Sequence, residues 1–280
     1  MNNQRKGLFW IICWCVAFTC GVSISKLLSS STNNLSLFCV RYLTGFFFFL
    51  PVFIPHLKPL PKFKAGIKLH VLRALCIGCS TLLTYQTYRH LPLAVATTIG
   101  FTGPLLAASF GIFFLKEKPS MAKAIALISG YLGVLFIVQP GYIPFNFYII
   151  TGIGMCTLAS IANTLARYIS TYDNPIIIMI SSTVILATVA LFGVLFGPTN
   201  IAASDLKLLI MVGMFGSFSQ FSYIKAVSSA DVSYVAPFEY TRLLLVVPIG
   251  YFFFQEVINL GQWLGMCLII IGSIYLSKKG

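Results

Sequence analysis

The pair Glu239 and Arg242 is the clearest candidate for chemistry in this sequence. Arg242 stands near the middle of a long apolar segment, and Glu239 precedes it by three residues. Residues three apart share one face of a helix, and a charge at the centre of a bilayer costs about 2.5–3.5 kcal/mol even on insertion scales. If the segment crosses a membrane, the pair indicates a substrate or coupling site, or else an ion pair that fixes helix packing.

The chemistry of this pair depends on how strongly its two members interact. A neighbouring Arg favours an ionised carboxylate, which would make Glu239 a poor proton carrier unless a substrate displaced Arg242. A free Arg242 would favour carboxylates and zwitterions. A neutralised pair would leave the faces of nearby tyrosines to hold a cation. The residues themselves leave both interpretations open.

Polar and aromatic side chains gather on neighbouring apolar segments. Small-molecule sites are usually lined by aromatic faces beside a few polar groups, although any one of these tyrosines could instead serve helix packing. The candidate substrate-binding residues are Arg242, Glu239, Tyr85, Gln86, Tyr88, Asn163, Gln220, Tyr223 and Tyr240.

Prolines interrupt two of the apolar segments. Pro104 lies in one, and Pro237 and Pro248 lie in another. Each proline removes a backbone hydrogen bond and frees a carbonyl, which is tolerated in a membrane where the break meets neighbouring helices or lines a cavity. We therefore place Pro104 and Pro237 near the binding site.

Other reactive residue types have ordinary explanations. Arg41 lies one to two turns into its segment, so its side chain could reach the lipid headgroups or serve a site within the membrane. Arg73 and Lys26 lie near segment ends, and we expect their side chains to reach the headgroups. Cys76 and Cys79 form a C-x-x-C inside an apolar segment without a second pair, and we expect small hydrophobes rather than a metal site. The sequence has no P-loop, H-E-x-x-H or G-x-S-x-G, so we expect neither an enzyme nor a cofactor.

The composition determines what kind of molecule must hold these residues. Of 280 residues, 58% are hydrophobic and only 9% are charged, which excludes a soluble enzyme because too little polar surface is available. A membrane helix needs about 20 apolar residues, and the sequence predicts an all-α integral membrane protein with ten such helices. They fall near 8–28, 36–55, 70–89, 93–115, 122–139, 147–167, 175–196, 207–226, 232–254 and 260–277.

The basic residues predict the orientation of these helices. The net charge of +13 would suggest nucleic acid in a soluble protein, but here the charges are divided among the loops. With a cytoplasmic N-terminus, thirteen Lys and Arg residues fall in cytoplasmic loops and ends and two, Arg89 and Lys207, fall outside. We expect both termini in the cytoplasm, no nucleic-acid partner, and an uncleaved first helix that follows Arg5 and Lys6.

The chain also contains an internal repeat. The third and eighth segments align Gly78 with Gly213 and Tyr88 with Tyr223, and the fourth and ninth segments end F-F-L-K-E and F-F-F-Q-E, at Glu117 and Glu256. Two halves of five helices, 1–141 and 145–280, are implied. Because five is odd, the second half must enter the membrane upside down, and its loops lack the basic residues of the first half. Inverted repeats are typical of transporters.

These segments resemble the EamA family of the drug/metabolite transporter superfamily. The resemblance rests on L-P-L-A at 91–94, F-T-G-P at 101–104 and A-P-F-E-Y-T at 236–241, with Arg41 and Leu72-Arg73 as further family-like positions. It implies two inverted EamA repeats, a central cavity and a bacterial inner membrane. The family moves amino acids and other small metabolites, and its S-adenosylmethionine uptake carriers are similar too. Arg242 departs from the family pattern.

Together these features predict a secondary or facilitative carrier for a small polar or amphipathic metabolite, amino-acid-like or S-adenosylmethionine-like, that works by alternating access. The alternative is a membrane scaffold or assembly subunit that transports nothing, with an intramembrane enzyme as a third reading. We expect a small-molecule substrate and the lipid bilayer as partners, and a monomer or homodimer.

Overall fold

A computed structural model describes residues 3–25, 28, 32–56, 63–91, 96, 99–138, 147–197, 201–245 and 260–279. Within these ranges the chain is helical and contains no strand. Helical segments occupy all ten predicted positions, most with bounds within a few residues of those predicted. They are α1 (Asn3–Ser25), α2 (Asn34–Phe53) with the 3-10 turn η1 (Ile54–His56), α3 (Ile67–His90), α5 (Gly103–Leu115), α6 (Met121–Val138), α7 (Phe147–Ile169), α8 (Pro175–Phe196), η2 (Ala203–Asp205), α9 (Leu206–Ser229), α10 (Val232–Val235) with the 3-10 helix η3 (Ala236–Arg242), and α12 (Leu260–Lys279).

Local sequence explains where several helices begin. The carboxamide of Asn33 accepts a hydrogen bond from the Ser36 N–H (2.7 Å) and starts α2. Asn174 does the same for the Ile176 N–H (3.0 Å) at α8, where Pro175 occupies the first turn. Such side-chain acceptors satisfy N–H groups that have no partner within the helix, and a first-turn proline has no N–H to lose.

The surface of the molecule is that of a membrane protein. Five described helices are long and apolar enough to cross a bilayer: α1, α2 with η1, α3, α7 and α8. Large apolar side chains point outward, with Phe113 78% and Phe196 81% exposed. Exposed apolar side chains at this density suit lipid and not water.

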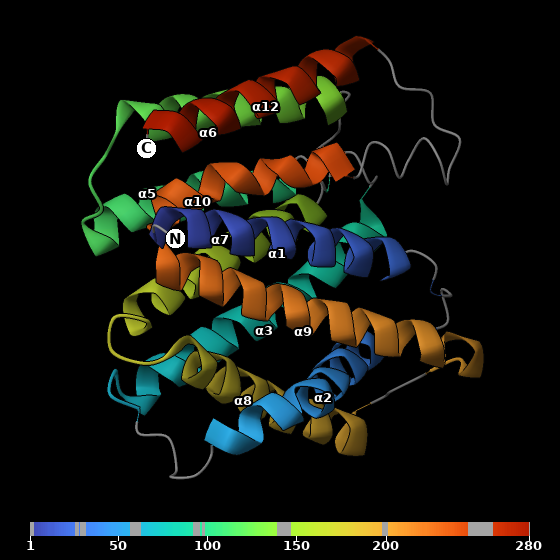
Figure 1. The fold of residues 1–280 in the computed structure, drawn as a ribbon. Coiled ribbons are helices and arrows are strands. Elements are labelled where there is room, and N and C mark those ends of the chain that lie inside the picture. The colour runs from blue at the N-terminus through green and yellow to red at the C-terminus, as the bar shows by residue number, and fades with distance from the viewer. Residues whose placement is uncertain are drawn as a thin grey trace.

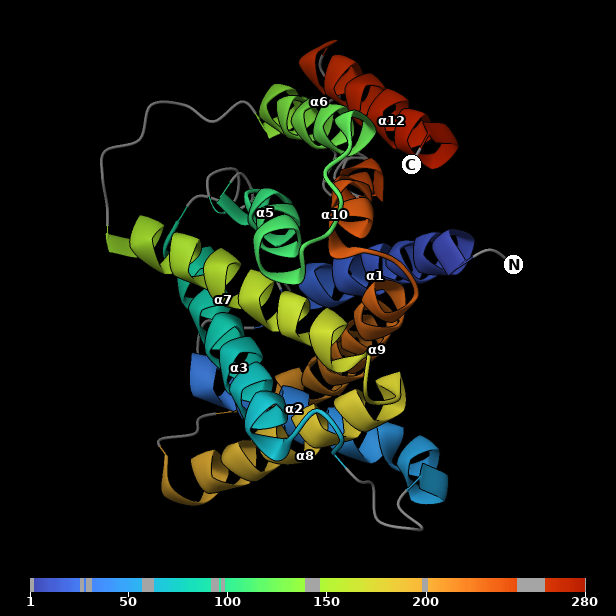
Figure 2. The same cartoon turned by 90° about the vertical axis from the view of Figure 1, so that its left-hand side faces the viewer.

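The helices pack in pairs that join the two halves of the chain. In Figures 1 and 2, α6 and α12 lie side by side at one edge, with α1 and α9 adjacent in the body of the molecule. α1 and α9 run antiparallel, since Gly7 of α1 faces Ala230 and Gly21 faces Phe215. α3 and α7 make the equivalent antiparallel pair, in which first and third helices of opposite halves meet.

Corresponding helices of the two halves run in opposite directions. In the second-helix pair, α2 and α8, Gly193 faces Cys39 and Gly197 faces Leu35. In the fifth-helix pair, α6 and α12, Gly133 faces Gly265 and Ile269, and Gly272 faces Ser129. Each pair is therefore antiparallel, as a two-fold axis in the membrane plane requires. The predicted all-α fold of two inverted repeats is confirmed.

Some sequence features discussed above lie outside the described residues. These are Lys26, the L-P-L-A stretch from residue 92 onward, Pro248 and Glu256. The part of the fourth segment before residue 96 and the part of the ninth after residue 245 belong to the same group.

Candidate functional site

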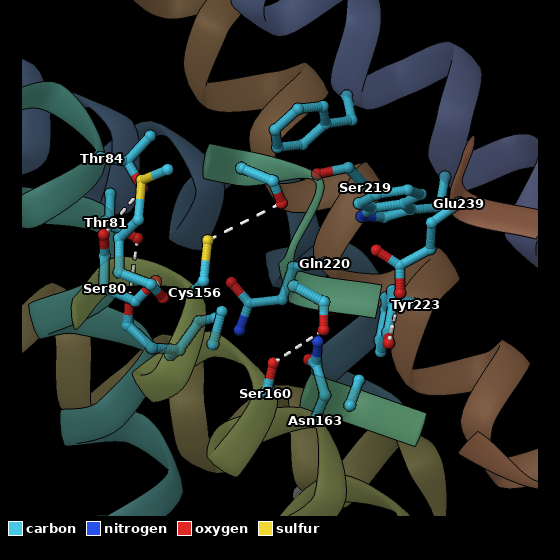
Figure 3. A pocket seen from close by; sticks show the side chains of 18 of the residues that line it. Ser80, Thr81, Thr84, Cys156, Ser160, Asn163, Ser219, Gln220, Tyr223 and Glu239 are labelled. Atoms are coloured by element: carbon cyan, nitrogen blue, oxygen red, sulfur yellow. Dashed lines mark hydrogen bonds between the residues drawn. The ribbon is translucent and has the colours of Figure 1, made fainter. Parts of the chain in front are cut away.

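A cavity of about 170 Å³ lies where helices of both halves meet. Its wall is built from α1, α3, α5, α7, α9 and η3, with Arg41 added from α2. In Figure 3, Ser80, Thr81 and Thr84 of α3 occupy one side of the cavity, Tyr223 and Glu239 the opposite side, and Ser160, Asn163 and Gln220 lie between them. The wall of the cavity thus combines apolar side chains with a smaller set of polar ones, as is usual for a small-molecule site.

Helix breaks lie beside this cavity, since Gly103 of α5 and Glu239 and Arg242 of η3 are on its wall. In the fourth segment, residues 101 and 102 form a turn and Pro104 sits in the first turn of α5. In the ninth, the chain changes from α-helix to the 3-10 helix η3, which has Pro237 in its first turn. The two breaks fall in corresponding helices of the two halves.

Thiols of α1 and α7 lie near backbone carbonyls at these breaks in a two-fold arrangement. Cys15 of α1 lies 3.7 Å from the Phe238 carbonyl oxygen. Cys156 of α7 lies 3.2 Å from the Ile99 carbonyl oxygen. The Ser160 hydroxyl donates to the Gly103 carbonyl (3.1 Å). The Ile99 carbonyl also accepts from the Thr102 N–H (2.9 Å) and the Phe238 carbonyl from the Thr241 hydroxyl (2.6 Å), so the thiols add weak second contacts to carbonyls that already have partners.

Arg242 is held by aromatic faces. Its guanidinium carbon lies 4.1 Å from the ring centroid of Phe101, 4.9 Å from that of Phe18 and 5.6 Å from that of Trp14, and the residue is 8% exposed. Each ring attracts the cation electrostatically, most strongly where water is absent. The cavity therefore contains a full positive charge whose planar faces are covered.

Glu239 binds a tyrosine instead of the arginine. Its Oε1 accepts a hydrogen bond from the Tyr223 hydroxyl at 2.9 Å. Among the described residues, no ion pair within 4.0 Å joins Glu239 to Arg242. The packing interpretation of this pair as a direct ion pair is therefore wrong, because aromatic rings and a hydroxyl have taken the place of mutual contact.

The repeat explains why there is room for the charged pair. At the spacing that relates Glu117 to Glu256, the counterparts of Glu239 and Arg242 are Gly100 and Gly103. A Cβ on Gly100 would lie 3.3 Å from the Tyr88 hydroxyl and 3.9 Å from Arg242 Nη2, and a Cβ on Gly103 would meet nothing within 4 Å. The second half thus provides the charged side chains of Glu239 and Arg242, and at the equivalent positions of the first half Gly100 and Gly103 have no side chain that would fill the cavity.

The candidate residues from the sequence fall into two groups in the structure. The cavity wall includes Arg242, Glu239, Tyr88, Asn163, Gln220 and Tyr223. It does not include Tyr85, Gln86 or Tyr240. Tyr85 accepts a hydrogen bond from Arg41 (3.3 Å), Gln86 accepts one from Asn34 (2.9 Å), and Tyr240 is fully buried against Phe101.

The expectation for Arg73 was wrong, and of the two alternatives for Arg41 the structure favours a place inside the protein. Both side chains line the cavity and do not reach the headgroups. Arg73 is 1% exposed and donates from Nη1 to the Ser182 hydroxyl of α8. Position along a helix suggested the surface, but α8 and α9 cover these faces of α2 and α3 and turn both guanidinium groups inward.

Other cavity residues escaped sequence reasoning. Trp14, Phe18, Cys156 and Gly100 lie in apolar segments without a distinguishing signal, and Gly103 appears only within the F-T-G-P stretch. Only the repeat register could have revealed the two glycines. No group of three His, Cys, Asp or Glu side chains in the described ranges is placed to hold a metal ion. Cys76 is buried, Cys79 is exposed, and both are free thiols.

A carboxylate also ties the two halves together at the end of α5. Glu117 accepts hydrogen bonds from the backbone N–H groups of Val232 (2.8 Å) and Ser233 (2.9 Å) at the start of α10. Close by, Asp231 pairs with Lys123 (3.3 Å) and Arg167 (3.0 Å). An anion at a helix start is favourable because the free N–H groups point toward it.

Comparison with known proteins identifies the same repeat. The model of the EamA-like transporter family matches residues 5–139 and again residues 146–278. A riboflavin transporter of Brucella anthropi is 26% identical over 217 residues, 75% of this chain and 76% of that protein. An S-adenosylmethionine uptake transporter of Rickettsia conorii is 24% identical over 292 residues, 100% of this chain and 97% of that protein. A solved crystal structure superposes with a TM-score of 0.80 at 14% identity over 99% of both chains, which shows the same fold.

Proposed function

The chain belongs to the EamA-like transporter family, and from that premise we propose that it is a secondary or facilitative carrier that works by alternating access. The observation that carries the proposal is the charged cavity between two inverted halves, with a broken helix from each half beside it. Inverted halves give two related packings of one site, and rocking between them exposes the site to either side. Residues 1–141 and 145–280 are the moving halves.

The proposed substrate is a small polar or amphipathic metabolite, amino-acid-like or S-adenosylmethionine-like. Support comes from the mixed wall of the cavity, where Trp14, Phe18 and Tyr88 offer aromatic faces beside ionised groups. The name of the Rickettsia relative agrees with this class. A flavin is the second candidate, favoured by the name of the Brucella relative and by the same aromatic faces.

We assign direct substrate contact to the candidate residues on the cavity wall. Arg242 and Glu239 supply the charges, and Tyr88, Asn163, Gln220 and Tyr223 supply aromatic faces and hydrogen bonds. The Nε2 of Gln220 is buried without a partner among the described residues, so it is available to donate to a substrate. Tyr85 acts through Arg41, and Gln86 and Tyr240 position the helices.

The proposed location is a bacterial inner membrane with both termini in the cytoplasm. The bias of thirteen basic residues to two supports this orientation. Both labelled ends of the chain lie on one side of the molecule (Figure 1), as an even number of crossings requires. We expect the carrier to act as a monomer or homodimer without a cofactor.

Flux through purified protein in liposomes separates the carrier from a scaffold or assembly subunit that transports nothing. Labelled S-adenosylmethionine, riboflavin and a mixture of amino acids are offered outside, with empty liposomes as the control. The carrier predicts uptake of at least one compound above the control. Uptake equal to empty liposomes for every compound would favour the scaffold.

A further inference from the structure

Two arginines in the cavity have no acidic partner among the described residues. Arg73 is 1% exposed; its Nη1 donates to Ser182, and its buried Nε has no partner. Arg41 donates from Nη1 to the Tyr85 hydroxyl (3.3 Å) and lies 5.6 Å from the ring centroid of Tyr42. Both guanidinium groups line the cavity, and neither is neutralised by the helices around it.

The carboxylates that could neutralise them are engaged elsewhere. The chain has six Asp and Glu residues, of which Glu256 lies outside the described residues. The other five have these partners: Glu117 binds Val232 and Ser233, Asp173 binds Lys64, Ala65 and His70, Asp205 binds Thr32, Asp231 binds Lys123 and Arg167, and Glu239 binds Tyr223.

The cavity therefore carries an excess of positive charge. Arg41, Arg73 and Arg242 face it with Glu239 as the one carboxylate on the described wall. A buried cation without a counter-ion is costly. Three aromatic rings stabilise the charge of Arg242. Arg41 has the ring of Tyr42, and the buried Nε of Arg73 has no hydrogen-bond partner.

The neighbouring hydroxyls have no free proton to donate to an anion. Ser80, Thr81 and Thr84 each donate their proton to a backbone carbonyl, at 2.8 Å in each case. Figure 3 shows the three on the cavity side of α3. With those protons engaged, the donors left for an anion at this side are the guanidinium N–H groups, which suit the two oxygens of a planar oxyanion.

We propose that the side of the cavity that carries Arg41 and Arg73 is an oxyanion subsite, so that the carried metabolite bears a carboxylate or a phosphate. This inference rests on the proposed function, because it takes the cavity as the transport site. The oxyanion binds on the side of the cavity that carries Arg41 and Arg73, and the apolar or aromatic body of the substrate extends toward Trp14 and Phe18 near Arg242. A neutral or purely cationic molecule leaves the two guanidinium groups uncompensated and binds more weakly.

Matched ligand pairs test the subsite on the purified full-length protein. S-adenosylmethionine is compared with its decarboxylated analogue, and riboflavin 5′-phosphate is compared with riboflavin, by ligand-induced thermal shift. The acidic member of at least one pair is expected to bind about tenfold more tightly. Discrimination in the first pair alone identifies a carboxylate, and in the second alone a phosphate. Equal binding within both pairs, or no binding by either acidic compound, overturns the proposal.

Variants show whether the two arginines cause the discrimination. Arg41→Gln and Arg73→Gln should remove it, Arg41→Lys should keep most of it, and Lys207→Gln, an exposed site outside the cavity, should leave it unchanged. If Arg73→Gln does not fold, Arg41→Gln and Arg41→Lys decide alone. Discrimination that survives Arg41→Gln in a folded protein contradicts the subsite.

Parallel uptake into liposomes separates this inference from the proposed function. Uptake that treats acidic and non-acidic members alike contradicts the subsite and leaves the carrier intact. Oxyanion-selective binding without uptake of any compound contradicts the carrier and leaves the subsite intact.

Discussion

At the scale of single residues, each buried charge is held by a partner of a particular kind. Arg242 lies against three aromatic faces, and Glu239 binds the Tyr223 hydroxyl. Asp173, in the turn between α7 and α8, accepts hydrogen bonds from the backbone N–H groups of Lys64 and Ala65, each at 3.0 Å. Partners of this kind let a chain with few charges keep them in place. Because each partner is a single residue, a point substitution can test each contact.

Asp173 predicts an acid-dependent loss of stability. Burial alone would raise the pKa of this carboxyl, but hydrogen bonds from the Ala65 N–H, His70 and the Lys64 N–H outweigh burial and hold its pKa below the usual value. The unfolded chain then binds the proton more tightly, so the carboxylate stabilises the fold above about pH 4 and loses this effect as the pH falls further. Asp173→Asn should lower the melting temperature at neutral pH.

The measurement is the melting temperature of both proteins between pH 7 and pH 3. The gap between wild type and Asp173→Asn should stay constant above about pH 5 and narrow below about pH 4. Lys68→Gln, an exposed neighbour whose replacement also changes the charge by one unit, is the control and should show no such narrowing. A gap of constant size down to pH 3 would argue against the pKa assignment.

The sequence predicted which charges matter only where one stood deep in an apolar run. Arg242 and Glu239 could be recognised this way. Arg41 and Arg73 could not, because their depth was compatible with the headgroups and only the packing of α8 and α9 turns them inward. Trp14 and Phe18 gave no signal either, since an aromatic residue in an apolar helix has the same pattern whether it faces lipid or a cavity.

At the scale of helices, glycines set how closely the halves approach. Gly7 and Gly21 both lie on the face of α1 that meets α9. A Cβ on Gly7 would lie 2.7 Å from the Cβ of Ala230, and one on Gly21 would lie 3.5 Å from the Cβ of Phe215. The first distance is a clash and the second is an ordinary contact. Gly7 therefore provides the test position and Gly21 the control position within one helix pair.

Gly7→Ala should destabilise the protein and Gly21→Ala should not. Overpacking at a rigid contact costs about 1–3 kcal/mol, whereas alanine in an open helical position gains up to about 1 kcal/mol from helix propensity. The midpoint of thermal unfolding in one detergent, followed by gel filtration of the remaining folded protein, compares the two. Equal midpoints for the two variants would show that the α1–α9 contact is looser than described.

Helix positions were predictable because their cause is local. Continuous apolar runs, Asn33 and Asn174 as caps, and Pro104 and Pro237 as breaks all act within a few residues. The 3-10 form of η3 and the thiol that lies near its Phe238 carbonyl were not predictable. Cys15 is more than 200 positions away from Phe238 in the chain. Neither segment contains a pattern that predicts contact with the other.

At the scale of the whole molecule, the inverted repeat organises everything else. It pairs α1 with α9 and α3 with α7, sets corresponding helices antiparallel, and places two charges opposite two glycines. The repeat and its inversion could be predicted from the sequence because the two Glu-ending segments and the loop charges are independent signals. The shape of the cavity could not be predicted, because it depends on side-chain packing between the halves.

The proposed orientation predicts which loops are reachable from outside the cell. Ser204 and Thr171 are both exposed and lie in loops assigned to opposite faces. Ser204→Cys should react with a membrane-impermeant maleimide in intact cells, and Thr171→Cys should react only after permeabilisation. Reaction of the unmodified chain, which has eight cysteines, is subtracted. The reverse pattern would place the termini outside and contradict the orientation.

The central claim is that the cavity between the two halves is the transport site. The most direct measurement is uptake of the best-transported compound into liposomes by wild type, Arg242→Gln and Lys207→Gln at matched protein density. Loss of the charge held by Phe101, Phe18 and Trp14 should reduce uptake at least tenfold, since a charge-assisted contact is worth about 1.5–3 kcal/mol. Lys207→Gln should transport like wild type. Normal uptake by a folded Arg242→Gln protein would contradict the account.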